Sequence, residues 1–319
     1  MIDNTENDYI QRTHNIAISF SNGYFLNADY ILAVEGPTDK KFYQKYTNLE
    51  ILISTEMTNA TKVKIDCRNK ILKAISEQKN KGLHWFGIMD SDYSLPKIPS
   101  DIELDKDIIF TDANSLETML VKYAGIDNFE KIIKKINWQL VKRYRLEKNI
   151  VLLALEFSYR IGCLRKKNNE DSLYLNFDGV LKSSNYYLDF LTYTKPKEII
   201  KNNKNEFIYT VSFDFDKFVD SLIEKSHFFI EEVSLKNFKD DFFSIETSPW
   251  IEYCQGHDII HLILALNKLH QKISNDIKEL TASTHDILDN IIITKYKNEF
   301  FNQSKIALWL YDKEKIKNI

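Results

Sequence analysis

Short apolar runs alternate with helix-like segments over the first 125 residues of the chain, and this alternation limits the possible folds more than any other feature. Residues 30–34 are a continuous apolar run. The segment that follows, 37–46, has a proline in its first turn, where the ring costs a helix no hydrogen bond. A run that is apolar on both faces is typical of a parallel strand covered by helices on both sides. The pattern therefore predicts an α/β domain whose mostly parallel sheet is flanked by helices.

The same patterns predict the remaining elements. Within the α/β part we expect a β-rich N-terminal segment at 14–34, strands near 63–65 and at 85–89 and 107–111, and helices at 69–77 and from Ser115, capped by Asn114 or Ser115. Beyond residue 125 the pattern turns helical, at 128–136, 139–161, 214–225, 257–273 and 304–315. We expect a catalytic domain at 1–125 and a mainly helical region at 126–319, in which the Lys- and Asn-rich stretch 170–210 is an insertion or a loop.

Two acidic motifs stand where predicted strands end. The first runs from Glu35 to Asp39 and includes Gly36, which lets the backbone turn sharply, and the second contains Asp90 and Asp92. Ligands of open parallel sheets bind beyond the carboxyl ends of the strands, so we expect these carboxylates to converge there. Taken singly, the first motif fits a helix cap and the second a turn. Taken together they favour a shared site.

Converging carboxylates repel one another unless a cation joins them. Oxygen ligands without His or Cys suit Mg²⁺ or Mn²⁺, and such ions assist phosphoryl chemistry by holding phosphate oxygens and activating a water molecule. The motifs therefore favour a divalent-metal site of the kind that assists phosphoryl chemistry. The chain has no glycine-rich phosphate loop, with 8 Gly in 319 residues, so we do not expect it to hydrolyse ATP itself.

The order of these motifs resembles a known family. An apolar strand ending in Glu-Gly-x-Thr-Asp, followed by a later strand ending in Asp-x-Asp, is similar to a Toprim domain. The segment Thr111-Asp112-Ala113-Asn114-Ser115-Leu116-Glu117 resembles the strand and Leu-Glu pair that follow in OLD-like nucleases. The layout is similar to the OLD-like Toprim proteins found beside ABC-type ATPases in defence loci, such as the effector subunit of PARIS anti-phage systems.

The resemblance implies roles for individual residues. Glu35 is expected to ligate a metal and to act as a general acid or base, while Asp39 and Glu117 complete one metal position. Asp90 and Asp92 hold a second ion or share the first. Residues 255–260 stand where the family has a Gly-Lys-Asp-Leu-Leu-like segment. His257 replaces the usual Lys, which leaves open whether this position touches phosphate.

The resemblance also implies an activity and partners. It implies an endonuclease that is held by an ABC-type ATPase, is released when a phage protein is sensed, dimerises, and cleaves host RNA, most often tRNA. A DNA-cutting OLD-like nuclease is one alternative. The other is a Toprim module that assembles with an ATPase without catalysis, although such a scaffold has no need of converging carboxylates.

A basic segment is the predicted nucleic-acid surface. Residues 131–204 hold 16 Lys and Arg against 7 Asp and Glu, although the whole chain has a net charge of −3. Cations neutralise phosphates and the interleaved aromatic residues can stack on bases, whereas a solvated helix face explains the same pattern without a ligand. The candidate contacts are Lys135, Lys142, Arg143, Arg145, Arg165, Lys166 and Lys167.

Two further cations lie beside the predicted metal site. Lys40 and Arg68 stand near helix N-termini, where they could stabilise charge on a transferred phosphate or serve as ordinary surface charges. The three cysteines are far apart in sequence, which argues against a disulfide framework. The first residues lack a signal-peptide pattern and no apolar run has the length of a membrane span, so we expect a cytoplasmic protein without membrane contact.

Overall fold

The computed structural model describes residues 30–56, 67–93, 96–134, 144–181, 183–201, 204–226, 249–274 and 295–317. Backbone contacts divide the chain into two compact units. The first unit combines the chain up to Asp112 with the segment from Phe301 onward, and the second runs from Ala113 to Phe300. The predicted division at residue 125 into a catalytic domain and a helical region stays a prediction.

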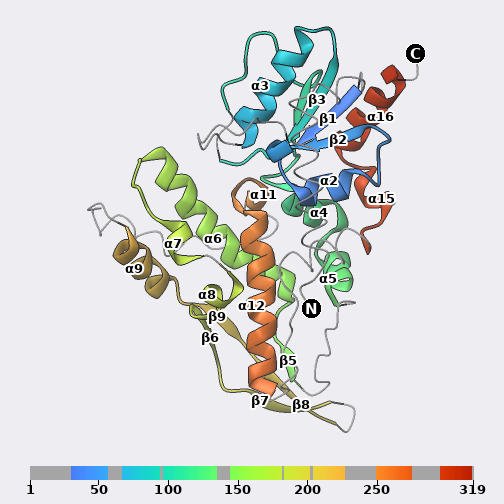
Figure 1. The fold of residues 1–319 in the computed structure, drawn as a ribbon. Coiled ribbons are helices and arrows are strands. Elements are labelled where there is room, and N and C mark those ends of the chain that lie inside the picture. Colours follow the sequence, from blue (N-terminus) through green and yellow to red (C-terminus); the bar gives the residue numbers. More distant parts are fainter. Residues whose placement is uncertain are drawn as a thin grey trace, which may run out of the picture. The chain divides into compact units, whose positions relative to one another are not determined.

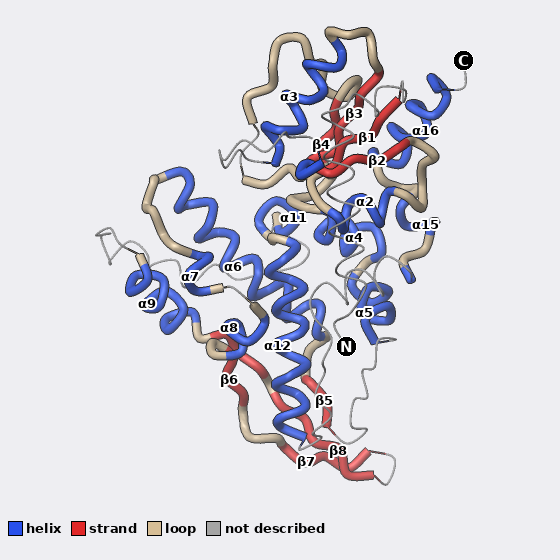
Figure 2. The backbone as a smooth tube through the Cα atoms, viewed as in Figure 1, coloured by secondary structure: helices blue, strands red, loops and turns tan. Residues whose placement is uncertain are grey.

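The first unit is built on a four-stranded, all-parallel sheet in the order β2-β1-β3-β4 (Figures 1 and 2). Its elements are β1 (Tyr30–Val34), α2 (Pro37–Tyr43), β2 (Glu50–Ile53), a 3₁₀ turn (Ser54–Glu56), α3 (Cys67–Lys79), β3 (His84–Met89), β4 (Ile108–Phe110) and α16 (Lys305–Lys317). All but one of the residues of β1 are fully buried, as a strand covered on both faces requires. The predicted α/β class and parallel sheet are confirmed.

Helices cover both faces of this sheet. Ile71 and Ile75 of α3 press against Gly87, where an added Cβ would lie 2.8 Å from Ile75 Cδ1. The neighbouring Phe86 contacts Trp309 of α16, with ring centroids 6.0 Å apart. Consecutive strand residues point to opposite faces, so α3 and α16 flank the sheet from opposite sides. The glycine in β3 therefore permits the close approach of α3.

The second unit combines helices with two small sheets. Its elements are α4 (Leu116–Ala124), α5 (Ile126–Lys134), β5 (Tyr144–Leu146), α6 (Ile150–Glu170), α7 (Phe177–Val180), α8 (Ser184–Leu188), β6 (Leu191–Tyr193), β7 (Lys197–Lys201), β8 (Lys204–Tyr209), β9 (Val211–Phe213), α9 (Phe215–Lys225), α11 (Trp250–Tyr253) and α12 (Gly256–Ser274). The strands form a β5-β8-β7 sheet and a β6-β9 pair. The short helix α15 (Asn298–Phe301) leads the chain back to the first unit.

Helices α6 and α12 form the centre of the second unit. Helix α6 begins at Ile150 and is capped by Asn149, whose Oδ1 accepts a hydrogen bond of 2.8 Å from the Val151 N–H. The apolar run of α12 is buried and packs against α6 and α8. Predicted helices at 128–136, 214–225, 257–273 and 304–315 correspond to α5, α9, α12 and α16.

Several predicted elements differ from the structure. The strand β2 was not predicted. The strand expected near 63–65 lies outside the described residues, and so do residues 14–29 of the expected β-rich segment. The helix expected at 139–161 begins only at Ile150, because residues 144–146 form β5 and pair with β8. The stretch 170–210 holds two short helices and β6 to β8 rather than a plain loop. The mainly helical character predicted for 126–319 is not confirmed.

The three cysteines are free thiols. Cys163 and Cys254 are buried, whereas Cys67 is partly exposed at the start of α3. Burial raises the pKa of Cys254, so this thiol stays protonated, and its S–H donates to the carbonyl oxygen of Leu155 at 3.5 Å. Cys254 thus serves as a core residue of the second unit.

Candidate functional site

The two acidic motifs of the first unit follow neighbouring strands. Strands β1 and β3 pair in parallel, so their carboxyl ends share one edge of the sheet. Glu35 and Gly36 come directly after β1, and Asp90 and Asp92 follow β3. The strand order therefore brings both motifs to the edge where parallel sheets bind ligands.

Glu35 is fixed to the strands on either side of its own. Its Oε1 accepts a hydrogen bond of 2.8 Å from the backbone N–H of Asp90, after β3. Its carbonyl oxygen accepts a bond of 2.7 Å from the hydroxyl of Ser54, after β2. These two bonds hold the Glu35 carboxylate against the start of the second acidic motif. Ser54 was not among the predicted residues, because no motif in the sequence around it signals this contact.

Asp39 takes part in the start of α2. Its Oδ2 accepts a hydrogen bond of 2.9 Å from the N–H of Gly36, the residue before the helix. This is the helix-capping role that the sequence left open for the first motif. Lys40 follows in α2, with its own N–H bonded to the Gly36 carbonyl oxygen at 3.1 Å. Gly36 thus ties Asp39 and Lys40 to the end of β1.

Asp92 has an unusual backbone and a cationic neighbour. Its φ angle of 44° lies in the left-handed region, where Asp is tolerated better than most residues. Its Oδ2 lies 3.4 Å from Nη1 of Arg68 in the first turn of α3. Between the two aspartates, the Ser91 hydroxyl donates to the Thr111 carbonyl oxygen at 2.6 Å, which clamps the ends of β3 and β4 together. The predicted cation Arg68 therefore does stand beside the second acidic motif.

Glu117 belongs to the second unit. It lies in the first turn of α4 and is only 6 % exposed. Ser115, the N-cap of α4, donates from its hydroxyl to Glu117 Oε2 at 2.9 Å. The start of α12 packs directly on this pair, since a Cβ built on Gly256 would lie 2.0 Å from Glu117 Oε2 and 2.2 Å from Ser115 Oγ. Gly256 is therefore the residue that admits the carboxylate of Glu117.

Gly256→Ala is expected to destabilise the protein by about 1–3 kcal/mol, because the added methyl group overpacks a buried contact. Thermal or urea unfolding measures the change. Gly36→Ala is the control, since its nearest neighbour, Asp39 Oδ2, lies 3.6 Å from the built Cβ. In the double variant Gly256→Ala/Glu117→Ala the carboxylate is gone, so part of the loss should be recovered. Strict additivity of the two single variants would refute the contact as the cause.

The first turn of α12 also carries one member of a buried ion pair. Asp258 is 1 % exposed, and its carboxylate accepts bonds from Arg165 Nε at 3.2 Å and Nη2 at 3.1 Å. The Tyr187 hydroxyl donates to the same carboxylate at 2.5 Å. Burial and the Asp258 charge raise the pKa of Tyr187 well above its usual value, so it remains a donor. The neighbouring His257 is exposed.

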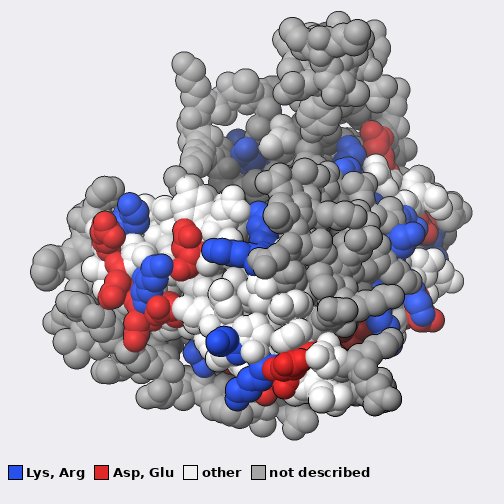
Figure 3. All heavy atoms as spheres, turned by 90° about the horizontal axis from the view of Figure 1, so that it is seen from below, with Lys and Arg blue, Asp and Glu red and all other residues white. Residues whose placement is uncertain are grey.

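The described residues of the predicted basic surface have local partners. Arg165 binds Asp258 and lies over the Phe177 ring, Lys166 donates to the Tyr253 hydroxyl at 3.1 Å, and Lys167 pairs with Asp171 at 2.9 Å. Arg145 pairs with Glu206 at 3.2 Å across the β5-β8 contact. Lys135, Lys142 and Arg143 lie outside the described residues. On the face drawn in Figure 3, the described cations and anions are interspersed rather than gathered by sign.

The donors at the sheet edge are all carboxylates, which is the ligand type that Mg²⁺ and Mn²⁺ prefer. Among the residues that the structure describes, no group of three or more His, Cys, Asp or Glu side chains is arranged to hold a metal ion. The carboxylates are therefore the right kind of ligand for such an ion, but in the described residues they are not arranged as a complete ligand group.

No protein-family model matches this chain, and no curated protein is significantly similar to it. Within the described residues, none of the helices combines the length and apolar character needed to cross a membrane.

Proposed function

We propose that the four-stranded sheet is a Toprim-like catalytic domain and that the chain is a metal-dependent phosphodiesterase acting on nucleic acid. The hydrogen bond from the Asp90 N–H to Glu35 Oε1 carries this proposal, because it joins the two acidic motifs at one edge of a parallel sheet. A pure scaffold would use this hydrogen bond but not the negative charge of the side chain that accepts it. The parallel strand order supports the same reading.

Glu35, Asp90 and Asp92 are the residues proposed to hold Mg²⁺ or Mn²⁺, with Asp39 as an additional ligand, while the metal role of Glu117 stays a prediction from the family resemblance. Such an ion, when bound, neutralises phosphate charge and activates water for attack on phosphorus. Glu35 is oriented for this role by its bond to Asp90. Arg68 keeps Asp92 in place and supplies a cation near the phosphate.

The substrate and biological role rest on the family resemblance. We propose RNA, with tRNA as the favoured target, and a role as a toxic effector of anti-phage defence that an ABC-type ATPase holds until infection and that acts as a homodimer. A DNA-cutting nuclease of the same chemistry is the alternative substrate assignment.

The proposal is tested by incubating the purified chain with tRNA and with supercoiled plasmid, in Mg²⁺, in Mn²⁺ and in EDTA. We expect tRNA fragments in the presence of either metal and intact tRNA in EDTA. Plasmid cleavage with intact tRNA would keep the phosphodiesterase and replace the substrate. Intact nucleic acid of both kinds under every metal condition would overturn the catalytic proposal.

A second candidate, a non-catalytic module that assembles with an ATPase, has one observation in its favour. In the described part of the chain, Asp39 is engaged in a helix cap and Asp92 in an ion pair, so both motifs also satisfy local structural needs. The two candidates differ in their need for charge at Glu35, which a scaffold does not use.

A further inference from the structure

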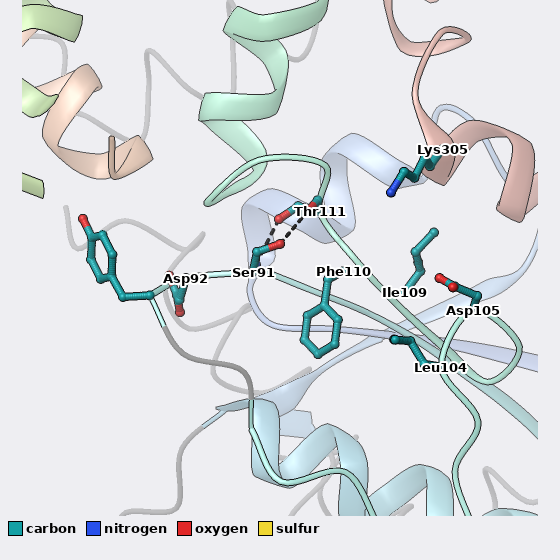
Figure 4. Close-up of a pocket in the computed structure, with 9 residues that line it drawn as sticks. Ser91, Asp92, Leu104, Asp105, Ile109, Phe110, Thr111 and Lys305 are labelled. Carbon is teal, nitrogen blue, oxygen red and sulfur yellow. Dashed lines mark hydrogen bonds between the residues drawn. The ribbon is translucent and has the colours of Figure 1, made fainter. Parts of the chain in front are cut away.

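A pocket of about 430 Å³ lies in the first unit beside the second acidic motif. Its lining includes Asp92 after β3, Ile109 and Phe110 of β4, Asp105 in the preceding loop and Lys305 of α16. Figure 4 shows Asp92 at one end of the pocket, the Phe110 ring between, and Asp105 and Lys305 at the other end. Pockets of this volume take ligands of the size of a nucleotide.

The pocket follows the outer edge of the sheet, part of which is already bridged by Leu104 to Ile108. Strand β4 is the last in the order β2-β1-β3-β4. Ile109 and Phe110 point to opposite faces, as consecutive strand residues do, so a pocket lined by both lies along the strand's outer side. Asp107 and Thr111 use their backbone groups to bond β3, at 2.9 Å each. By alternation, the N–H and C=O of Phe110 point away from β3.

The outer edge of β4 therefore offers one backbone donor and one backbone acceptor, both from Phe110, rather than a continuous row of such groups. The other outward-facing residue of β4, Ile108, already accepts a bond of 2.7 Å from the Asp105 N–H of the preceding loop. An added peptide strand would therefore gain the bonds of a single residue, which is too few for strand addition. A nucleobase needs only such a donor and acceptor pair.

Lys305 supplies the charge that a phosphate requires. It is exposed near the start of α16, and it forms no ion pair with any residue that the structure describes. Its backbone N–H is bonded to Asp112 Oδ2 at 2.9 Å, which anchors the residue beside the end of β4. Asp92 and Asp105 both repel a phosphate, and Asp105 lies at the same end of the pocket as Lys305, so the Lys305 ammonium is the attractive charge that has to outweigh it.

We propose that this pocket binds one nucleotide of the substrate strand, next to the phosphate that is cleaved. The phosphate of this nucleotide binds Lys305, and its base packs on Phe110 and bonds the strand's outward backbone groups. The assignment rests on the proposed phosphodiesterase function, because it places the pocket beside Asp92 of the acidic site.

Binding of AMP and of adenosine, measured by calorimetry on the full chain in EDTA, tests the pocket without cleavage. We expect AMP to bind about tenfold more tightly than adenosine, because one charge-assisted contact with Lys305 distinguishes them. Lys305→Ala should reduce AMP affinity to that of adenosine and leave adenosine binding unchanged. Lys315→Ala, an exposed lysine of the same helix paired with Asp312, is the matched control and should alter neither.

Two results would overturn the pocket assignment. One is AMP affinity that Lys305→Ala leaves unchanged. The other is inorganic phosphate binding as tightly as AMP, since the base would then contribute nothing. If either result is found while the chain still cleaves nucleic acid in a metal-dependent way, only the pocket assignment is refuted and the phosphodiesterase proposal stands. Lys305-dependent AMP binding without cleavage of any nucleic acid refutes the phosphodiesterase, and with it the placement beside a cleaved phosphate.

Discussion

Glu35→Gln is expected to lower metal-dependent cleavage by at least about 10²-fold while leaving the fold intact, because a lost carboxylate ligand removes several kcal/mol of charge stabilisation. The amide oxygen of Gln can still accept the bond from the Asp90 N–H, which is 2.8 Å long in the native chain. The substitution therefore removes charge and keeps geometry. Glu35→Ala removes both, and is expected to cost about 1–2 kcal/mol of stability as well.

Cleavage rates and unfolding free energies of both variants separate chemistry from folding. Glu50→Gln is the matched control, because Glu50 is an exposed glutamate at the opposite end of neighbouring β2. Its rate should equal that of the native chain. A Glu35→Gln protein that cleaves at the native rate would remove Glu35 from the chemistry and favour the assembly module.

Asp258→Ala is expected to destabilise the protein by about 3 kcal/mol, because Arg165, whose side chain is only 18 % exposed, loses its carboxylate partner. The Tyr187 hydroxyl loses its acceptor in the same step. We expect the melting temperature to fall by roughly 5–10 °C, as measured by calorimetry. Urea unfolding measures the loss of unfolding free energy.

Asp171→Ala removes a comparable ion pair at the surface. Asp171 is 48 % exposed and pairs with Lys167 one turn earlier in α6. This exposed pair is expected to contribute no more than about 0.5 kcal/mol. Equal stability losses in Asp258→Ala and Asp171→Ala would show that burial does not strengthen the Arg165 pair.

Local patterns were sufficient to predict the strands that carry the acidic motifs. The apolar runs ending at Val34 and Met89 are continuous, bounded and followed by polar turns, so each was predicted close to its observed limits. The contact between Glu35 and Asp90 agrees with the expectation that both motifs meet at one edge. Meeting at one edge requires only that the strands be parallel, whereas the hydrogen bond itself requires β1 and β3 to be neighbours, which no local pattern shows.

Elements that depend on distant partners were missed. Residues 144–146 contain Arg and Leu, which favour helices, yet they form β5 because β8 lies alongside. Arg165 stands in a run of cations that resembles a solvated surface, and only the fold brings Asp258 to it. Lys305 likewise lies far in sequence from the strand whose end it adjoins. Such pairings are set by tertiary structure and leave no local periodicity.

Trp309 of α16 packs on Phe86 and donates from its indole N–H to the Asp105 carbonyl oxygen at 2.8 Å, so the first unit needs segments from two separate parts of the chain. During synthesis the ribosome produces residues 113–300 after the sheet and before α16. The sheet therefore emerges without the helix that packs on Phe86 of β3, and remains so for many seconds at ordinary elongation rates. An activity located on this sheet would mature only after translation has passed residue 309.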